Sequence, residues 1–305
     1  MQLNKPLLIC VVGPTAIGKT ALAIKLANAF SAEIISADSR QFYKEMKIGT
    51  AVPSEEELQA APHHFIQTKS IQENYSVGDF EREAIAFLSH YFTKNKIAIM
   101  VGGSGLYVDA VVNGLDRFPV VPKNVREKLN RELTINGLEN LQVELKQVDP
   151  KYFQKVDIQN PQRVIRALEI YRATGLPYSS FLTKESTQRD FNTIYIGISA
   201  EREQVYNRIN LRVDNMIAEG LVEEARKLYH FSDKNALNTV GYKELFQFFN
   251  GEITLEEAIS EIKKNTRRFA KRQLTWFKKN KGIHWFDYQT NPTVVVDFIK
   301  EKNAS

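Results

Sequence analysis

The sequence predicts an α/β fold, in which a mostly parallel sheet is flanked by helices and a helical domain is inserted into the chain. Short apolar segments alternate with helical patterns in the first third of the sequence. The first of these segments runs into a glycine-rich turn and then a helix. Strand character is then lost between residues 115 and 190 and returns afterwards. Strands that alternate with helices form parallel sheets covered on both faces.

Residues 1–114 are predicted to form the first part of this α/β core. Three short apolar segments predict strands: Leu7–Val12, 32–37 and 97–101. Apolar residues at helical spacing follow the first strand, and further helices are expected over 76–92 and from Leu106. Residues 44–75 are expected to be mixed, with prolines and the pair His63 and His64 marking loops.

Residues 115–190 are predicted to form the inserted helical domain. Amphipathic helices separated by prolines are expected over 125–136, 138–147 and 161–173. Residues 191–305 return to the core and carry a basic helical segment near their end. Their patterns predict strands over 193–198 and 284–286 and helices over 201–219, 221–230, 240–250 and 254–279.

Length and composition exclude several classes of protein. A chain of 305 residues that is 43% apolar and 25% charged buries a real core and differs from disordered or fibrous chains. The single cysteine, Cys10, excludes an internal disulfide and a multi-cysteine zinc site. The first apolar stretch, Leu7–Val12, is too short for a membrane span or a signal peptide. We therefore expect a cytoplasmic protein that makes no use of a membrane. We also expect a monomer.

The basic residues are concentrated near the carboxyl end of the sequence. The net charge is +5, but residues 263–281 hold nine basic side chains and no acidic one, so the rest of the chain is net acidic. The basic residues of this segment are Lys263, Lys264, Arg267, Arg268, Lys271, Arg272, Lys278, Lys279 and Lys281. Interleaved aromatic residues, Phe269, Trp276 and Phe277, suit a nucleic-acid partner. The alternative is a solvated basic helix whose aromatic side chains face the core.

A phosphate-binding loop follows the first strand. The motif G-x-x-x-x-G-K-[ST] is formed by Gly13, Pro14, Thr15, Ala16, Ile17, Gly18, Lys19 and Thr20. Glycines let backbone N–H groups turn toward an anion, the helix N-terminus adds partial positive charge, and the lysine adds a point charge. Thr20 is the predicted Mg²⁺ ligand. The motif and its position between strand and helix predict a P-loop NTPase-like core, against the alternative of an ordinary strand-to-helix turn.

Asp38 is the first candidate for catalysis. It follows the strand 32–37, which we expect to lie beside the strand that feeds the P-loop. In open α/β sheets the carboxyl ends of the strands form the ligand crevice. A carboxylate there either accepts a proton from a nucleophile or holds Mg²⁺ through water. The alternative is a helix N-cap.

Three further patterns leave alternatives open. Gly102, Gly103, Ser104 and Gly105 form a second glycine-rich turn, which either offers N–H donors or is a plain tight turn. Adjacent histidines point apart, so His63 and His64 favour a loop over a metal site. Arg163 and Arg166 share one helix face, where Glu169 is a possible ion-pair partner instead of a phosphate.

Taken together, the motifs resemble those of the tRNA dimethylallyltransferase (isopentenyltransferase) family, bacterial type. The matching segments are the P-loop, Asp38-Ser39-Arg40-Gln41, Gly102 to Tyr107, Pro161 to Glu169, Gly241-Tyr242-Lys243-Glu244 and Arg272-Gln273-Leu274-Thr275-Trp276-Phe277. Ile17, Phe42 and Ser104 depart from the usual residues without removing a functional group. Ordinary P-loop kinases do not share the Asp-Ser-Arg-Gln segment or the late Arg-Gln-x-Thr-Trp segment.

The resemblance implies a reaction and its partners. A dimethylallyl group would pass from dimethylallyl diphosphate to N6 of the adenine 3′ of the tRNA anticodon, position 37, releasing diphosphate with Mg²⁺ required. Asp38 would deprotonate the attacking amine, and Lys19 and Arg212 would neutralise the leaving group. The anticodon stem-loop would contact Asp38, Ser39, Arg40, Gln41, Ser104, Arg126, Gln162, Arg163, Val164, Ile165, Arg166, Arg268, Arg272, Gln273 and Trp276.

Two other functions remain compatible with parts of the sequence. A P-loop small-molecule or nucleoside kinase would use the P-loop and Asp38, but it has no evident need for the basic segment or the inserted domain. A non-catalytic RNA-binding module would explain the basic segment but leave Asp38 without a role. Incubation with dimethylallyl diphosphate, ATP and unmodified tRNA distinguishes the three by which compound is consumed.

Overall fold

The computed structural model describes residues 5–183 and 187–304. It divides into two compact units: one comprises Met1–Asn113 with Gln188–Ser305, and the other is Gly114–Thr187. The second unit is helical and starts close to the predicted start of the inserted domain, ending slightly before its predicted end. Within the described residues, no helix is long and apolar enough to cross a membrane.

The first unit is built on a parallel sheet, as predicted. The order of the strands is β3-β2-β4-β1-β5-β6, and every pair is parallel. The strands are β1 (Leu7–Val12), β2 (Ile34–Ser36), β3 (His63–His64), β4 (Ile97–Gly102), β5 (Asn192–Ser199) and β6 (Ile283–Asp287). β1 pairs along its whole length with β4 on one side and β5 on the other.

Two details of the sheet correct the sequence analysis. His63 and His64 were expected in a loop, but they form the edge strand β3 beside β2, where His64 Nε2 lies 2.6 Å from Glu33 Oε2. The strand before Asp38 was expected beside β1, but β4 lies between β1 and β2. A crossover helix is long enough to pass over an intervening strand, so chain order does not fix neighbours in the sheet.

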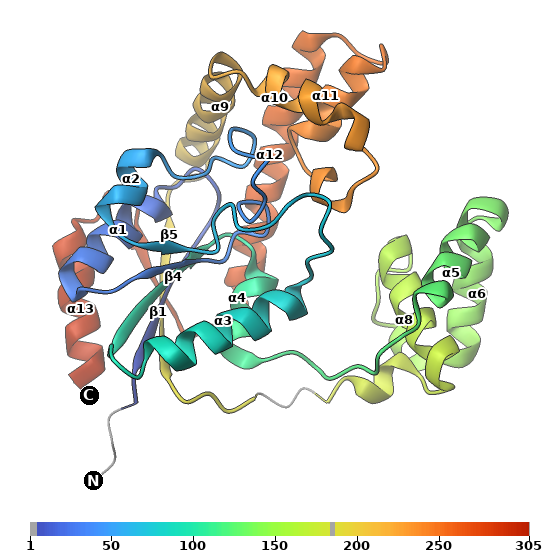
Figure 1. Cartoon of the computed structure of the whole chain (residues 1–305), viewed down its shortest axis with the longest axis horizontal. Coiled ribbons are helices and arrows are strands. Elements are labelled where there is room, and N and C mark those ends of the chain that lie inside the picture. Colours follow the sequence, from blue (N-terminus) through green and yellow to red (C-terminus); the bar gives the residue numbers. More distant parts are fainter. Residues whose placement is uncertain (1–4, 184–186, 305) are drawn as a thin grey trace. The chain divides into compact units, whose positions relative to one another are not determined.

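Helices cover both faces of the sheet (Figure 1). The helices of this unit are α1 (Lys19–Phe30), α2 (Glu55–Ala60), α3 (Val77–Tyr91), α4 (Gly105–Asn113), α9 (Arg202–Ala218), α10 (Leu221–Leu228), α11 (Tyr242–Phe249), α12 (Leu255–Phe277) and α13 (Pro292–Ala304). The sequence analysis missed α2 and α13. Ser76 caps α3, since its side chain accepts a hydrogen bond from Asp79 N.

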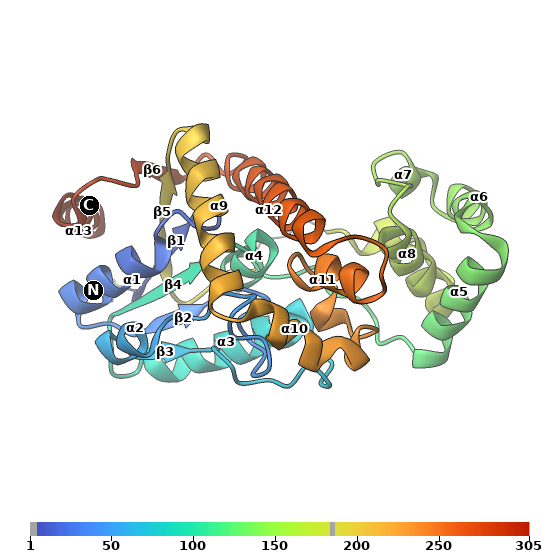
Figure 2. The same cartoon turned by 90° about the horizontal axis from the view of Figure 1, so that it is seen from above.

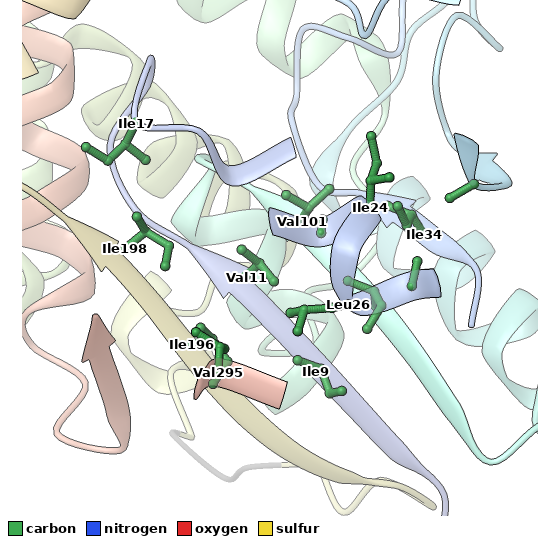
Figure 3. Packing of buried hydrophobic residues seen from close by; sticks show 14 of the residues in the cluster. Ile9, Val11, Ile17, Ile24, Leu26, Ile34, Val101, Ile196, Ile198 and Val295 are labelled. Atoms are coloured by element: carbon green, nitrogen blue, oxygen red, sulfur yellow. The ribbon is translucent and has the colours of Figure 1, made fainter. Parts of the chain in front are cut away.

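Alternate residues of β1 enter two separate cores because side chains in a strand point to opposite faces. Leu7, Ile9 and Val11 pack with residues of α1 and α13, as Figure 3 shows for Ile9 and Val11. Leu8, Cys10 and Val12 pack with residues of α3 and α4. All six side chains are buried. The sheet is therefore fixed from both sides, and only its edges remain for ligands.

A third hydrophobic cluster joins α9 to α12. These two helices contact each other, and their course can be followed in Figure 2. α12 packs against α9 and α11 and also contacts α4. Fully buried Tyr242 lies in this cluster with Val213 of α9 and Leu221 of α10. The basic segment begins near the middle of α12 and continues past its end, and two residues within it, Ala270 and Phe277, pack into the two cores of the sheet.

The helical unit has its own core. Its helices are α5 (Lys123–Asn136), α6 (Leu138–Val148), α7 (Pro150–Phe153) and α8 (Pro161–Thr174). Asn160 caps α8 through its side chain, with Pro161 in the first turn, and Gly175 ends the helix in a left-handed conformation. Arg172 of α8 forms ion pairs with Glu132 of α5 and Glu144 of α6.

The sequence analysis named Val164 and Ile165 among the tRNA contacts, but the structure buries their side chains. Both side chains are 0% exposed and pack in the core of this unit with Leu129, Leu141 and Leu145. They lie on the apolar face of α8, whereas Arg163 is exposed and Arg166 is partly exposed. We therefore revise the prediction that the Val164 and Ile165 side chains contact tRNA.

Ile165→Val is expected to cost about 0.5–1.5 kcal/mol of unfolding free energy, because it removes one methylene from a filled core. Urea denaturation of the full chain measures the change. RNA binding by the folded variant should equal that of the wild type, and a selective loss of RNA binding without destabilisation would contradict the core role.

Candidate functional site

Three loops meet at the carboxyl edge of the sheet because the strands before them are parallel. The P-loop follows β1, Asp38 follows β2, and Gly102 to Gly105 follow β4. Ala37 N donates to Val101 O at 2.7 Å, which ties the second loop to the third. A Cβ on Gly102 would lie 2.5 Å from Ala37 O, so only glycine permits this approach.

The P-loop has the backbone shape that its sequence predicted. Gly13 and Gly18 have φ angles of 146° and 100°, and Ala16 has a φ of 62°. A Cβ on Gly13 would lie 2.4 Å from Ile198 O. α1 begins at Lys19, near the end of the P-loop motif, so the N-terminus of this helix faces the interior of the loop.

Two cations lie beside the P-loop. Lys19 Nζ donates to Pro14 O at 2.7 Å. Burial lowers the pKa of Lys19 to about 8, Asp38 opposes this shift, and Arg212 adds to it. Arg212 comes from α9 and lies with Nη1 3.5 Å from Thr15 Oγ1. Burial also lowers the pKa of Arg212, against the attraction of Asp38.

Asp38 is held by a turn, so its predicted alternative as a helix N-cap is wrong. Its Oδ1 accepts from Arg40 N at 3.0 Å, and Gln41 N donates to Asp38 O at 3.2 Å. The segment that follows is a turn. The carboxylate is thereby fixed at the mouth of the loops, near both cations.

Two cavities meet at Asp38. The first, of about 1030 Å³, is lined by Thr15 to Ala21 of the P-loop region and by residues 50–57. The second, of about 560 Å³, is lined by Gly103 to Tyr107 and by residues of α12. Six residues line both: Thr15, Asp38, Thr50, Arg212, Met216 and Gln273. A carboxylate and a guanidinium therefore face both cavities at once.

The second cavity has an aromatic wall on α12. Phe269 and Trp276 are 39% and 38% exposed, whereas Phe277 is 2% exposed and belongs to the core. Trp276 Nε1 donates to Asp109 Oδ2 at 2.8 Å, and Arg272 lies 5.7 Å from the centre of the Phe269 ring. The aromatic side chains of the basic segment are therefore divided: Phe277 faces the core, whereas Phe269 and Trp276 are partly exposed at the second cavity.

Several predicted residues lie in the walls of these cavities. Ser104 Oγ accepts from Ser39 N at 3.1 Å and also donates to Ser39 Oγ at 3.1 Å. Gln41 Nε2 donates to Ala51 O at 2.9 Å. The guanidinium of Arg40 donates to the carbonyls of Asn235 and Ala236, which occupies it within the protein.

Other predicted residues are not among those that line the two cavities. Arg268 donates to Asn265 Oδ1 and lines neither cavity. Arg126, Gln162, Arg163 and Arg166 belong to the helical unit. Glu169, 6% exposed, accepts from both Arg126 and Arg166, and Gln162 Oε1 accepts from Arg126. The ion-paired alternative is correct for Arg166, yet the side chains of Arg126 and Arg166 remain 42% and 39% exposed.

The sequence analysis missed one carboxylate that shapes the first cavity. Glu224 of α10 accepts from three consecutive backbone groups, Lys47 N, Ile48 N and Gly49 N, at 2.8–3.0 Å. Its Oε1 also accepts from Tyr242 OH at 2.6 Å. These partners are far apart in the sequence, and a glutamate in an amphipathic helix gives no local signal of such a role.

The P-loop region fits a Mg²⁺ ion held together with phosphate. Among the residues that the structure describes, no cluster of three or more His, Cys, Asp or Glu side chains could hold a metal ion. Mg²⁺ is commonly bound by one or two protein oxygens plus substrate phosphates. Thr20 and Asp38 both line the first cavity and provide oxygen atoms of this kind.

This fold and site define an α/β protein with a P-loop at the carboxyl edge of a parallel sheet and with two cavities that share Asp38 and Arg212. Residues 41–280 match the IPP transferase family. The chain is 59% identical over 295 residues to the tRNA dimethylallyltransferase of Christiangramia forsetii, covering 97% of this chain and 98% of that protein. It is 56% identical over 301 residues to the tRNA dimethylallyltransferase of Flavobacterium psychrophilum, with 97% and 98% covered. The chain therefore belongs to the IPP transferase family, which confirms the resemblance inferred from its motifs.

Solved structures agree with this assignment. The tRNA isopentenylpyrophosphate transferase of Bacillus halodurans superposes with a TM-score of 0.74 at 38% identity, covering 98% of this chain and 97% of that one. A eukaryotic dimethylallyltransferase, described as acting on tRNA, gives a TM-score of 0.81 at 26% identity, covering 97% and 80%. The predicted α/β fold class is confirmed.

The pKa of Lys19 yields a prediction about pH. Lys19 loses its charge as the pH rises through about 8, so the affinity for inorganic pyrophosphate should fall by about tenfold between about pH 7 and 9. Isothermal titration calorimetry measures this change. Lys19→Arg keeps its charge throughout, so an equal fall in both proteins would exclude Lys19 as the cause.

Proposed function

We propose that this protein transfers a dimethylallyl group from dimethylallyl diphosphate to N6 of the adenine 3′ of the anticodon, position 37, in tRNA, and releases diphosphate. The observation that carries this proposal is the pair of cavities that share Asp38 and Arg212. A transfer reaction needs a donor and an acceptor to reach one point from two sides. The proposal also rests on membership of the IPP transferase family.

The first cavity holds the diphosphate of the donor. Backbone N–H groups of the P-loop, the N-terminus of α1, Lys19 and Arg212 surround it with positive charge. This charge is placed where the leaving diphosphate gains negative charge as the C–O bond breaks. Preorganised groups of this kind stabilise a transition state by several kcal/mol, on the order of 3–4 for a single donor. Mg²⁺, held through Thr20 and the diphosphate, would further neutralise the leaving group.

Asp38 acts as the base toward the acceptor. The lone pair of an exocyclic adenine amine is delocalised into the ring, so the amine is a weak nucleophile. A carboxylate that accepts its proton as the N–C bond forms lowers the barrier. Asp38 is suited to this role because its Oδ1 is anchored by Arg40 N while the side chain lines both cavities.

The second cavity receives the adenine. A base must leave its stack to reach a buried reacting carbon, and bases in anticodon loops unstack at low cost. Phe269 and Trp276 provide aromatic surface at this cavity, and Ser39 and Ser104 provide hydroxyl groups. Base stacking on aromatic side chains contributes about 1–3 kcal/mol per base.

The second half of α12 binds the phosphates of the tRNA. Lys263 and Lys264 in its first half are paired with Asp214 and Glu261. Lys271 and Arg272 are exposed and lie on the same helix as the aromatic wall. In the helical unit, Arg126, Arg163 and Arg166 are proposed as further phosphate contacts. Both cavities are lined by one chain, so we propose that the enzyme acts as a monomer, in the cytoplasm.

Asp38→Asn is the direct test of this mechanism. Shape and hydrogen-bonding capacity are kept while the base is removed, so single-turnover transfer should fall by roughly 10²- to 10⁴-fold. Binding of tRNA and of pyrophosphate should stay within about twofold, a difference of about 0.4 kcal/mol. Transfer at the wild-type rate would reduce Asp38 to a turn-forming residue.

The kinase alternative has its own outcome in the same assay. If the wild type consumes ATP with an acceptor and ignores dimethylallyl diphosphate, the proposed reaction is wrong. Lys19→Ala provides the matching control at the donor site, where pyrophosphate binding and transfer should both weaken while tRNA binding persists.

The basic surface of α12 is tested through salt dependence. Changing Arg268, Lys271 and Arg272 together to alanine should weaken tRNA binding and reduce the salt slope by up to about one unit per lost phosphate contact. Filter binding at several salt concentrations measures the slope. Lys263→Ala, which removes a lysine already paired with Asp214, is the control and should change the slope much less. An unchanged salt slope in the triple variant would show that these three side chains do not contact tRNA phosphates.

A further inference from the structure

Gln273 joins α12 to the P-loop. It is 6% exposed, although both neighbours on the helix, Arg272 and Leu274, are less buried. Its Oε1 accepts from Thr15 N at 2.8 Å, and its Nε2 donates to Gly103 O at 3.0 Å. One side chain therefore bridges the loops that follow β1 and β4.

The chemistry of these two bonds requires an amide. Thr15 N–H only donates and the Gly103 carbonyl only accepts, so the orientation of the Gln273 amide is fixed by its partners. The fit is tight: a Cβ on Gly103 would lie 2.2 Å from Gln273 Nε2 and 3.7 Å from Lys19 Nζ. Glutamate would keep the first bond and lose the second, and methionine would lose both.

The position of Gln273 connects the two cavities. Arg272 precedes it and Trp276 lies one helical turn later, and both line the second cavity. Gln273 itself lines both cavities, and its partner Thr15 belongs to the P-loop. Because a helix moves as a rigid element, a displacement of α12 at Trp276 or Arg272 also displaces Gln273. The hydrogen bond from Thr15 N to Gln273 Oε1 then transmits this displacement to the P-loop.

We propose that Gln273 is a positioning residue that couples occupation of the second cavity by RNA to the shape of the diphosphate cradle. This inference rests on the proposed function. RNA that stacks on Trp276 fixes α12, and α12 fixes the backbone of Thr15 and Gly103 on either side of Lys19. Coupling between two sites is reciprocal, so bound diphosphate tightens RNA binding by the same factor.

The affinity for inorganic pyrophosphate, measured with and without a saturating anticodon stem-loop RNA, tests this coupling. RNA should tighten pyrophosphate binding by roughly fivefold or more in the wild type, the lower end of usual couplings. In Gln273→Met this factor should approach one. A purely structural loss would weaken pyrophosphate binding equally with and without RNA. Gln247→Met, the same change at an exposed site on α11, should keep the wild-type factor.

A second variant keeps the test decisive if Gln273→Met folds poorly. Gln273→Glu retains the bond from Thr15, so its coupling factor should lie between those of the wild type and one. Wild-type coupling in either Gln273 variant, or none in the wild type, overturns the inference. Single-turnover prenyl transfer by the wild type separates the two hypotheses: without transfer the proposed function fails, whereas transfer without coupling refutes only the role of Gln273.

Discussion

The site depends on the parallel pairing of β1 with strands on both sides. Because β1 is hydrogen-bonded to β4 and β5 along its whole length, its end cannot shift without disrupting two ladders. The P-loop, Asp38 and the Gly102 turn therefore arrive at one edge with fixed spacing. Contacts that tolerate only glycine, at Gly13 and Gly102, then bring backbone to within van der Waals distance of backbone. Few side chains are needed to complete the site because the sheet has already brought these loops together.

The sequence predicted what is encoded locally. The P-loop was predictable because its glycines, lysine and threonine are contiguous, and the strands because they are apolar and short. The order of the strands in the sheet was not predictable, since nothing in the sequence near Asp38 indicates that β4 lies between β2 and β1. Val164 and Ile165 were named as tRNA contacts because the whole segment Pro161 to Glu169 was carried over from the family. In a helix only one face is exposed, and these two side chains lie on the buried face. Glu224 gave no signal in the sequence, and although Gln273 was singled out as a tRNA contact, nothing near it in the sequence indicates its bonds to Thr15 and Gly103.

The charged side chains of this protein differ in how far they are paired with one another. Residues 263–281 form one basic run in the sequence, yet in the structure Lys263 and Lys264 are paired with acidic side chains, whereas Lys271 and Arg272 are exposed. In the helical unit, Glu169 holds two arginines in place while leaving their side chains about two-fifths exposed. A carboxylate in a basic surface can thus orient cations for an external anion, at the cost of part of their attraction for it.

The hydrogen bonds that Glu224 accepts also affect where an anion can bind. Successive backbone N–H groups that converge on one point form a nest, which attracts anions whatever their origin. The first cavity is lined by the P-loop and by Lys47 and Ile48, which belong to such a row of donors from Lys47 to Gly49. Glu224 fills this row with the protein's own carboxylate, aided by Tyr242 OH. Because the carboxylate of Glu224 already accepts from these three N–H groups, they are not available to an anion that enters the cavity.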